Sequence, residues 1–135
     1  MTDVFDAETR SRVMRSVKGI NTTPERTVRT LLHATGYRYR LHRRDLPGKP
    51  DIVFSIRHKV IFVHGCFWHG HNCARGARIP KSNVQYWKKK IARNKQRDAR
   101  HLAALNKFGW KTLVIWECEM NNRAKLTRRL NRFLL

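Results

Sequence analysis

Acidic residues are scarce in this sequence: nine Asp and Glu stand against thirty Lys and Arg, which gives a formal net charge of +21. A folded chain with so large a positive excess repels itself and attracts polyanions. Solubility alone requires only a few net charges of either sign, so it does not explain the excess. The composition therefore favours nucleic acid as the partner, with an anionic membrane surface as the weaker alternative.

Long apolar runs, internal repeats and low-complexity tracts are absent. No segment is apolar over the roughly 20 residues that a transmembrane helix needs, and the N-terminus has no apolar signal-peptide core. We therefore expect a cytoplasmic protein that has no membrane-spanning segment and no membrane partner ahead of nucleic acid. Because no linker interrupts the chain, residues 1–135 are expected to form one domain, with residues 1–20 as a basic N-terminal arm or helix.

Cysteine is also rare, and the three cysteines cannot close a disulfide framework, which a reducing cytoplasm would oppose in any case. Cys66 and Cys73 lie in the segment HGCFWHGHNC, and Cys118 ends a later apolar run. Three thiolates with one imidazole would make a closed tetrahedral zinc site. The nitrogen ligand is either His69 or His71, and the spacing leaves both open. The alternative is that the cysteines are free thiols, with Cys118 buried as a small apolar residue.

Hydrophobic periodicity predicts an α/β fold, a mixed β-sheet flanked by helices. The expected order is helix, helix, three strands, helix, strand, helix. A second helix is expected from an N-cap at Thr23 to Gly36, and a long helix from about 82 to 107, closed by Gly109. The expected strands are 37–41, 51–56, 59–65 and 111–119, and the last helix is 122–135.

The long helix carries polar residues within its apolar stripe. Asn94 and Asp98 share a face with Trp87 and Ile91, so the periodicity alone favours burial of Trp87. Burying an unpaired carboxylate is costly, so Asp98 needs a cationic or hydrogen-bonding partner. A structural ion pair and a functional role are both compatible with this pattern.

A second group of residues has the chemistry of phosphate hydrolysis. Asp51 opens a strand, where its carboxylate could hold Mg²⁺ beside a phosphate, and His64 ends the next strand of the hairpin. His69, where it is not on zinc, can act as a general base, with Asp98 as the carboxylate that orients it. Glu25, near the start of a helix, could supply a second carboxylate around the ion.

Aromatic and basic residues follow the same region. Phe67 and Trp68 lie in a loop, where they either insert between base steps of a duplex or cover the small apolar core of the zinc loop. The long helix is rich in Lys and Arg that can neutralise phosphates. The residues expected to contact phosphates are Lys88, Lys89, Arg93, Asn94 and Arg97.

Four segments together resemble the very-short-patch-repair (Vsr) DNA mismatch endonucleases: LPGKPDIVF, KVIFVHGCFWHGHNC, YWKKKIARNKQRD and GWKTLVIWEC. The resemblance covers nearly the whole chain and implies a restriction-endonuclease-like α/β fold with a structural zinc. It implies Mg²⁺-dependent nicking of double-stranded DNA on the 5′ side of the thymine in a T:G mismatch. Such mismatches arise by deamination of 5-methylcytosine, and the nick initiates very short patch repair.

The implied partners are mismatched DNA, other mismatch-repair proteins and a cognate cytosine-5 methyltransferase system. The resemblance also implies a bacterial-type, nucleoid-associated protein. A monomer is expected, because a lone mismatch lacks the two-fold symmetry that dimers read.

The resemblance also implies a role for each matching residue. Asp51 becomes the main Mg²⁺ ligand, aided by the backbone carbonyl of Val63, and Glu25 joins the hydrated metal. His69 becomes the general base, oriented by Asp98. His64 lies at the scissile phosphate.

The remaining roles concern zinc and the base stack. The implied zinc ligands are Cys66, His71, Cys73 and Cys118. The implied wedge inserted beside the mismatch is formed by Phe67, Trp68 and Trp87, with Met14 on the minor-groove side. One departure stands out: the wider restriction-enzyme family usually has an acidic residue and a lysine where this chain has Phe62 and His64.

Overall fold

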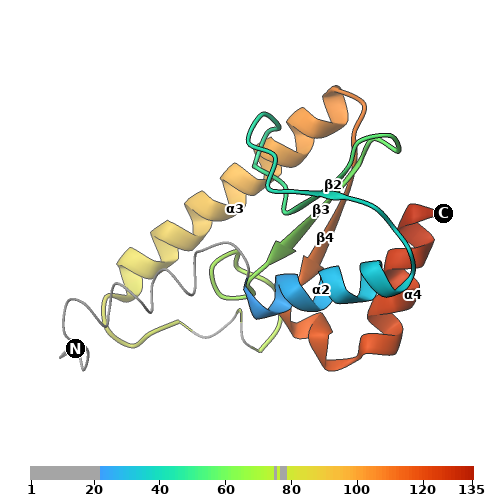
Figure 1. Ribbon diagram of the computed structural model, residues 1–135. Helices are drawn as coiled ribbons and strands as arrows, with labels where there is room; N and C mark the ends of the chain where they lie inside the picture. Colours follow the sequence, from blue (N-terminus) through green and yellow to red (C-terminus); the bar gives the residue numbers. More distant parts are fainter. Residues whose placement is uncertain (1–21, 75, 77–78) are drawn as a thin grey trace, which may run out of the picture.

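The structure is a computed structural model that describes residues 22–74, 76 and 79–135. The expected N-terminal arm, including Met14, lies outside the described residues. The described part forms a mixed sheet with helices on both faces (Figure 1). The α/β class and the expected order of elements after the arm are therefore confirmed.

The sheet has four strands in the order β1-β2-β3-β4. The hairpin of β2 (Ile52–Phe54) and β3 (Lys59–His64) is antiparallel, and β3 pairs in parallel with β4 (Lys111–Trp116). The edge strand β1 (Arg40–Leu41) is shorter than the expected 37–41, because its pairing with β2 covers only two residues. Tyr37 and Tyr39 instead pack edge-on against Phe54.

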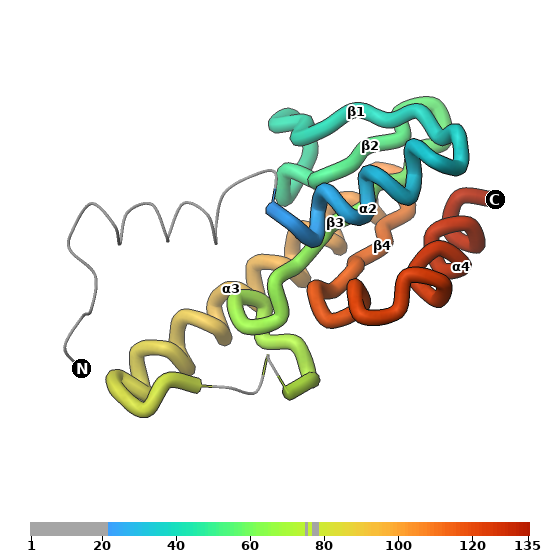
Figure 2. Tube along the Cα trace, turned by 60° about the horizontal axis from the view of Figure 1, so that its bottom comes forward, coloured from blue at the N-terminus to red at the C-terminus, as the bar shows by residue number. Residues whose placement is uncertain are grey.

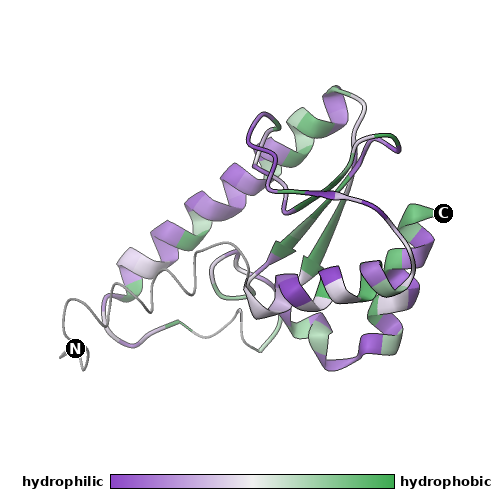
Figure 3. Cartoon of the chain, viewed as in Figure 1, coloured by the Kyte–Doolittle hydropathy of each residue, from purple (hydrophilic) through white to green (hydrophobic). Residues whose placement is uncertain are grey.

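Three helices cover the two faces of this sheet (Figures 1 and 2). Alternate strand residues point to opposite faces, so neighbours such as Ile52 and Val53 belong to different cores. Ile52 packs in the larger core with α2 (Thr23–Ala34) and α4 (Arg123–Leu134). Val53 packs in the smaller core, to which α3 (Val84–Lys107) contributes Leu105. Figure 3 shows the hydrophobic strands between helices whose outer faces are hydrophilic.

The helix ends differ slightly from the expected ones. The N-cap of α2 is Thr22, not Thr23, because Thr22 is extended and its hydroxyl oxygen accepts the Glu25 N–H at 3.4 Å. Gly36 follows the end of α2 with a positive φ of 84°, a conformation that favours glycine. Helix α3 begins at Val84, two residues later than expected.

The topology brings several chain segments to one edge of the sheet. His64 and Trp116 are paired at the C-terminal ends of β3 and β4. Asp51 immediately precedes β2, which runs antiparallel to β3, so it lies at the same edge. A 3₁₀ helix, η1 (Glu117–Asn121), follows β4 there. None of the helices in the described ranges is long and apolar enough to cross a membrane.

Candidate active site and metal centre

Asp51 is fixed at the sheet edge by the neighbouring strand. Its Oδ2 accepts a hydrogen bond from the Val63 N–H at 2.7 Å. Burial raises the pKa of Asp51 to about 6, the Val63 hydrogen bond opposes this, and the Glu25 charge adds to it. A carboxyl group in such surroundings gains most from a bound cation, which compensates the charge that burial penalises. Whether the Val63 carbonyl also serves as a ligand stays a prediction.

Glu25 lies next to Asp51 although it comes from a different element. It sits in the first turn of α2, where the helix dipole favours a carboxylate, and is only 2% exposed. The ligand atoms of Glu25, His42 and Asp51 lie within 4.8 Å of one another. Two carboxylates so close together fit a hard divalent cation such as Mg²⁺. Sequence reasoning missed His42, because nothing in its pattern distinguishes it from the other surface histidines.

His69, on the loop after β3, and Asp98, on α3, form a second group as a hydrogen-bonded pair. His69 Nδ1 lies 2.5 Å from Asp98 Oδ2. Burial opposes ionisation of Asp98, but the hydrogen bond and charge of His69 outweigh it and lower the pKa of Asp98. Asp98 therefore has the partner that its position on the apolar stripe of α3 required.

His64 stacks on His69, with ring centroids 3.7 Å apart and planes at 4°. Burial, reinforced by His69, lowers the pKa of His64 to about 3, so its ring is neutral at physiological pH. Its buried Nδ1 has no hydrogen-bond partner among the described residues. Buried polar atoms are nearly always satisfied in native proteins, so an orphaned nitrogen at this position suits a bound group.

Both residue groups face one cleft of about 1200 Å³. Its lining joins the start of α2, the turn before β2, the end of β3 and one face of α3. Arg97 and Lys90 bring positive charge to this lining. The arrangement places the carboxylates of Glu25, Asp51 and Asp98, two stacked histidines and cationic side chains around a space large enough for a piece of a nucleic-acid backbone.

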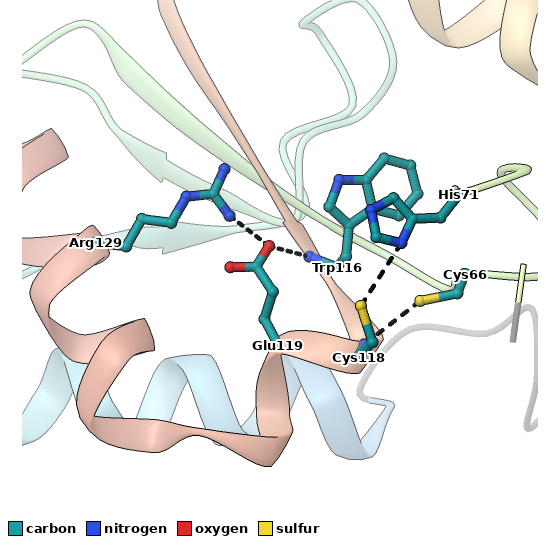
Figure 4. A network of polar contacts seen from close by, with 6 residues as sticks. All are labelled: Cys66, His71, Trp116, Cys118, Glu119 and Arg129. Carbon is teal, nitrogen blue, oxygen red and sulfur yellow. Dashed lines mark hydrogen bonds and ion pairs between the residues drawn. The ribbon is translucent and has the colours of Figure 1, made fainter. Parts of the chain in front are cut away.

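The three cysteines and His71 form a separate cluster, of which Figure 4 shows Cys66, His71 and Cys118. Their ligand atoms lie within 4.8 Å of one another, and Cys118 Sγ is 3.6 Å from His71 Nδ1. Burial raises the pKa of Cys66 to about 12 and also raises that of Cys118, so both thiols stay protonated without a cation. The donor set fits a closed tetrahedral zinc site, in which the ion replaces the thiol protons.

The loop after β3 separates the two histidines that the spacing left open. His71 joins the thiols, while His69 pairs with Asp98. Between them, Gly70 has a φ of 62°, and a Cβ there would lie 2.7 Å from Ile91 Cγ2 of α3. Only glycine allows the loop to approach α3 this closely while it turns.

Trp116 lies between the cysteine cluster and the cleft, and sequence reasoning missed it. Its ring stacks on His71 with centroids 4.1 Å apart and meets His64 edge-on at 5.3 Å. Its backbone N–H donates to Glu119, which also pairs with Arg129 (Figure 4). Its place directly before Glu117 and Cys118 at a strand end was the only signal in the sequence.

The three aromatic residues expected to act as a wedge lie together. Centroids of Phe67, Trp68 and Trp87 are 5.2 to 5.7 Å apart. All three are partly exposed, so the full burial that periodicity favoured for Trp87 is not observed. The side-chain amide of Asn94 donates to the Trp68 carbonyl at 2.9 Å and so fixes the wedge to α3.

The basic residues named from the sequence divide into two groups. Lys88, Lys89 and Arg93 are exposed on α3, while Arg97 is also exposed and lines the cleft. Their contacts with phosphates stay predictions. Asn94 also lines the cleft, although its amide N–H is directed to the Trp68 carbonyl.

Carboxylates, paired histidines and cationic side chains around one cleft of a mixed α/β fold define a nuclease, the class of enzyme that hydrolyses phosphodiester bonds. Residues 2–75 match the family described as DNA mismatch endonuclease Vsr. The chain belongs to this family.

Similarity to curated relatives extends over nearly the whole chain. It is 52% identical over 134 residues to the type II nicking enzyme V.XorIIP of Xanthomonas oryzae pv. oryzae, covering 99% of this chain and 98% of the relative. It is 46% identical to V.NmeAIP of Neisseria meningitidis serogroup A, covering 99% and 95%. It is 40% identical to the DNA mismatch endonuclease Vsr of Escherichia coli, covering 94% and 81%. The chain is therefore a DNA endonuclease of a family that acts in DNA nicking and mismatch repair.

Proposed function

We propose that this protein nicks double-stranded DNA on the 5′ side of the thymine in T:G mismatches, in a Mg²⁺-dependent reaction that initiates very short patch repair. The carrying observation is the single cleft that joins the Asp51–Glu25 pair to the His69–Asp98 pair. The wedge residues Phe67 and Trp68 line the same cleft. Chemistry and base-stack contact would thus occur within one bound segment of DNA.

His69 is the proposed general base. An ionised Asp98 only accepts hydrogen bonds, so the 2.5 Å contact requires the proton of His69 to reside on Nδ1. The other ring nitrogen, Nε2, then carries the lone pair that can take a proton from the attacking water. Asp98 holds this tautomer and stabilises the imidazolium that forms, as the carboxylate of a catalytic triad does.

His64 is proposed to lie at the scissile phosphate, and Asp51 and Glu25 are proposed to hold the metal ion beside it. The neutral His64 ring supports the His69 ring by stacking. Asp51, Glu25 and the Val63 carbonyl would hold the Mg²⁺ ion. When bound, such an ion neutralises charge on the phosphate and on the leaving 3′ oxygen.

A zinc ion held by Cys66, His71, Cys73 and Cys118 is proposed to be structural. All four donors belong to protein side chains, so a tetrahedral ion would leave no position open for substrate. Its role would be to keep the loop between β3 and α3 in one conformation. Phe67, Trp68 and the proposed base His69 lie on that loop, so the same ion would fix all three.

The wedge is proposed to enter the base stack beside the mismatch. Inserted apolar side chains unstack a base step and kink the duplex, at a cost of about a few kcal/mol that is least at a mismatched pair. This difference in unstacking cost favours insertion at a T:G mismatch over insertion at a Watson–Crick pair, even without hydrogen bonds to the bases. Phosphate contacts from Lys88, Lys89, Arg93 and Arg97 would add affinity without sequence preference, and Met14 would act from the minor groove.

A nicking assay on a set of duplexes that differ at one base pair tests this function. The same sequence carrying T:G, T:A or C:G at one position is incubated with the protein and Mg²⁺, and each strand is labelled separately. We expect a single nick 5′ to the thymine of T:G only. Equal cleavage of all three duplexes, or cleavage of both strands, would show a sequence-directed or general nuclease instead. Binding without any nick would show a DNA-binding module.

A further inference from the structure

His42 contacts the side chain of Glu25 and the backbone of Asp51. His42 follows β1 directly, and its ring Nε2 contacts Glu25 Oε1. Its backbone N–H donates to the Asp51 carbonyl oxygen at 3.2 Å. The Glu25 and Asp51 side chains come from the start of α2 and the start of β2, so His42 connects two elements that are otherwise separate in the sequence.

The backbone of His42 adopts a conformation that histidine seldom takes. Its φ is +51°, in the left-handed region where the Cβ of a non-glycine residue is disfavoured. Such a conformation persists where surrounding contacts determine it. Here the backbone bond to Asp51 and the ring contact to Glu25 are the two contacts that hold it.

The ring of His42 lies behind Glu25 rather than in front of it. Among the described residues, Glu25 and Asp51 line the cleft, whereas His42 does not. The His42 side chain is 20% exposed, against 3% for Glu25. A substrate in the cleft would therefore meet the carboxylates, and His42 would act on it only through them.

We propose that His42 is a positioning residue for the divalent cation of the active site. By donating from Nε2 to Glu25 Oε1, it fixes the orientation of the Glu25 carboxylate beside Asp51. The inference rests on the proposed function in one respect, that Glu25 and Asp51 hold the ion. Residues that orient metal ligands typically change metal affinity about 10- to 100-fold when replaced.

The test measures Mn²⁺ binding directly, so it does not depend on nicking. Purified protein with one added equivalent of zinc, which occupies the thiol cluster, is titrated with Mn²⁺, and free Mn²⁺ is followed by electron paramagnetic resonance. Asp51→Asn identifies the binding that belongs to this site. The test variants are His42→Leu, which removes the donor, and His42→Gln, whose amide nitrogen can occupy the place of Nε2. His33→Leu, an exposed histidine in the last turn of α2, is the matched control.

We expect His42→Leu to weaken Mn²⁺ binding at least tenfold, with His42→Gln and His33→Leu within about threefold of the parent protein. Unchanged binding in His42→Leu would overturn the proposal. Equal loss in His42→Leu and His42→Gln would also overturn it, because the donor would then not be what matters. If His42→Leu does not fold, His42→Asn takes its place: its amide is too short to reach Glu25, so it should lose affinity where His42→Gln does not.

Nicking of the T:G duplex across a Mg²⁺ titration separates this inference from the proposed function. We expect His42→Leu to need a higher Mg²⁺ concentration for half-maximal nicking and to approach the parent rate at saturation. A lower rate at every Mg²⁺ concentration, with a lower melting temperature, would indicate a purely structural role and overturn the inference. If the parent protein fails to nick T:G while the Mn²⁺ affinities follow the expected order, the proposed function is wrong and the positioning role of His42 stands.

Discussion

Asp98 accepts a hydrogen bond from Nδ1 of His69 at 2.5 Å, and the two residues are 29 positions apart in the sequence. One lies on the loop after β3 and the other in the middle of α3. The contact supplies the hydrogen-bonding partner that the partly buried Asp98 carboxylate needs. It also fixes the tautomer of the His69 ring. Helix α3 therefore both covers the sheet and lines the candidate active site.

Replacing Asp98 by Asn should therefore reduce the nicking rate strongly. The amide can donate as well as accept, so it no longer enforces the proton on Nδ1 and cannot stabilise an imidazolium. By analogy with the carboxylate of a catalytic triad, we expect a loss of about 10²- to 10⁴-fold in the single-turnover rate. Affinity for a T:G duplex, measured without Mg²⁺, should stay close to that of the parent. An unchanged rate would remove Asp98 from the reaction.

The pH dependence of nicking should reflect Asp51. Its pKa is raised to about 6 by burial, so the carboxyl group is protonated below that pH and ionised above it. Mg²⁺ binds only the ionised form, and we therefore expect nicking at a fixed, subsaturating Mg²⁺ concentration to fall as the pH drops through about 6. Because the cation competes with the proton, a higher Mg²⁺ concentration should move this fall to lower pH. A midpoint that is independent of Mg²⁺ would contradict the assignment and point to the histidines instead.

Removal of zinc should loosen the loop between β3 and α3. The protein as purified is expected to contain about one zinc per chain. A strong chelator, or Cys66→Ser, should lower the melting temperature and change tryptophan fluorescence, because Trp116 stacks on His71. The fluorescence of a Trp116→Phe variant should respond less to the same chelator, which serves as the control. Purified protein without zinc, with a melting temperature insensitive to chelation, would refute the zinc assignment.

The sequence carries most of the fold but only part of the site. Strand and helix order follow from hydrophobic periodicity, because each element buries one side against the sheet or helices. The length of β1 does not follow, since it depends on where His42 leaves the pairing with β2. The grouping of Cys66, Cys73 and Cys118 could be predicted from the sequence, because these are the only three cysteines in the chain.

Residue spacing alone does not separate His69 from His71, although the family resemblance assigns His71 to zinc. Their separation depends on the turn at Gly70, which sends one ring toward Asp98 and the other toward the thiols. His42 and Trp116 were missed for a related reason. Each acts through contacts made by residues distant in the sequence, and neither belongs to a periodic pattern or a recognisable spacing.

The wedge and the basic face of α3 should make separable contributions to DNA binding. Stacking of an aromatic side chain on a base is worth about 1–3 kcal/mol, so Trp68→Ala should reduce the preference for T:G over T:A duplexes by roughly 5- to 150-fold.

Lys89→Ala, an exposed change on α3, should instead weaken the affinity for both duplexes equally and lower the slope of log affinity against log salt by about one. Asn94→Ala should resemble a weaker form of Trp68→Ala, because it releases the Trp68 carbonyl from α3 without removing the ring. Binding titrations of both duplexes at several salt concentrations measure all three effects. If Trp68→Ala weakens both duplexes equally while preference is retained, the aromatic cluster stabilises the loop and does not enter the base stack.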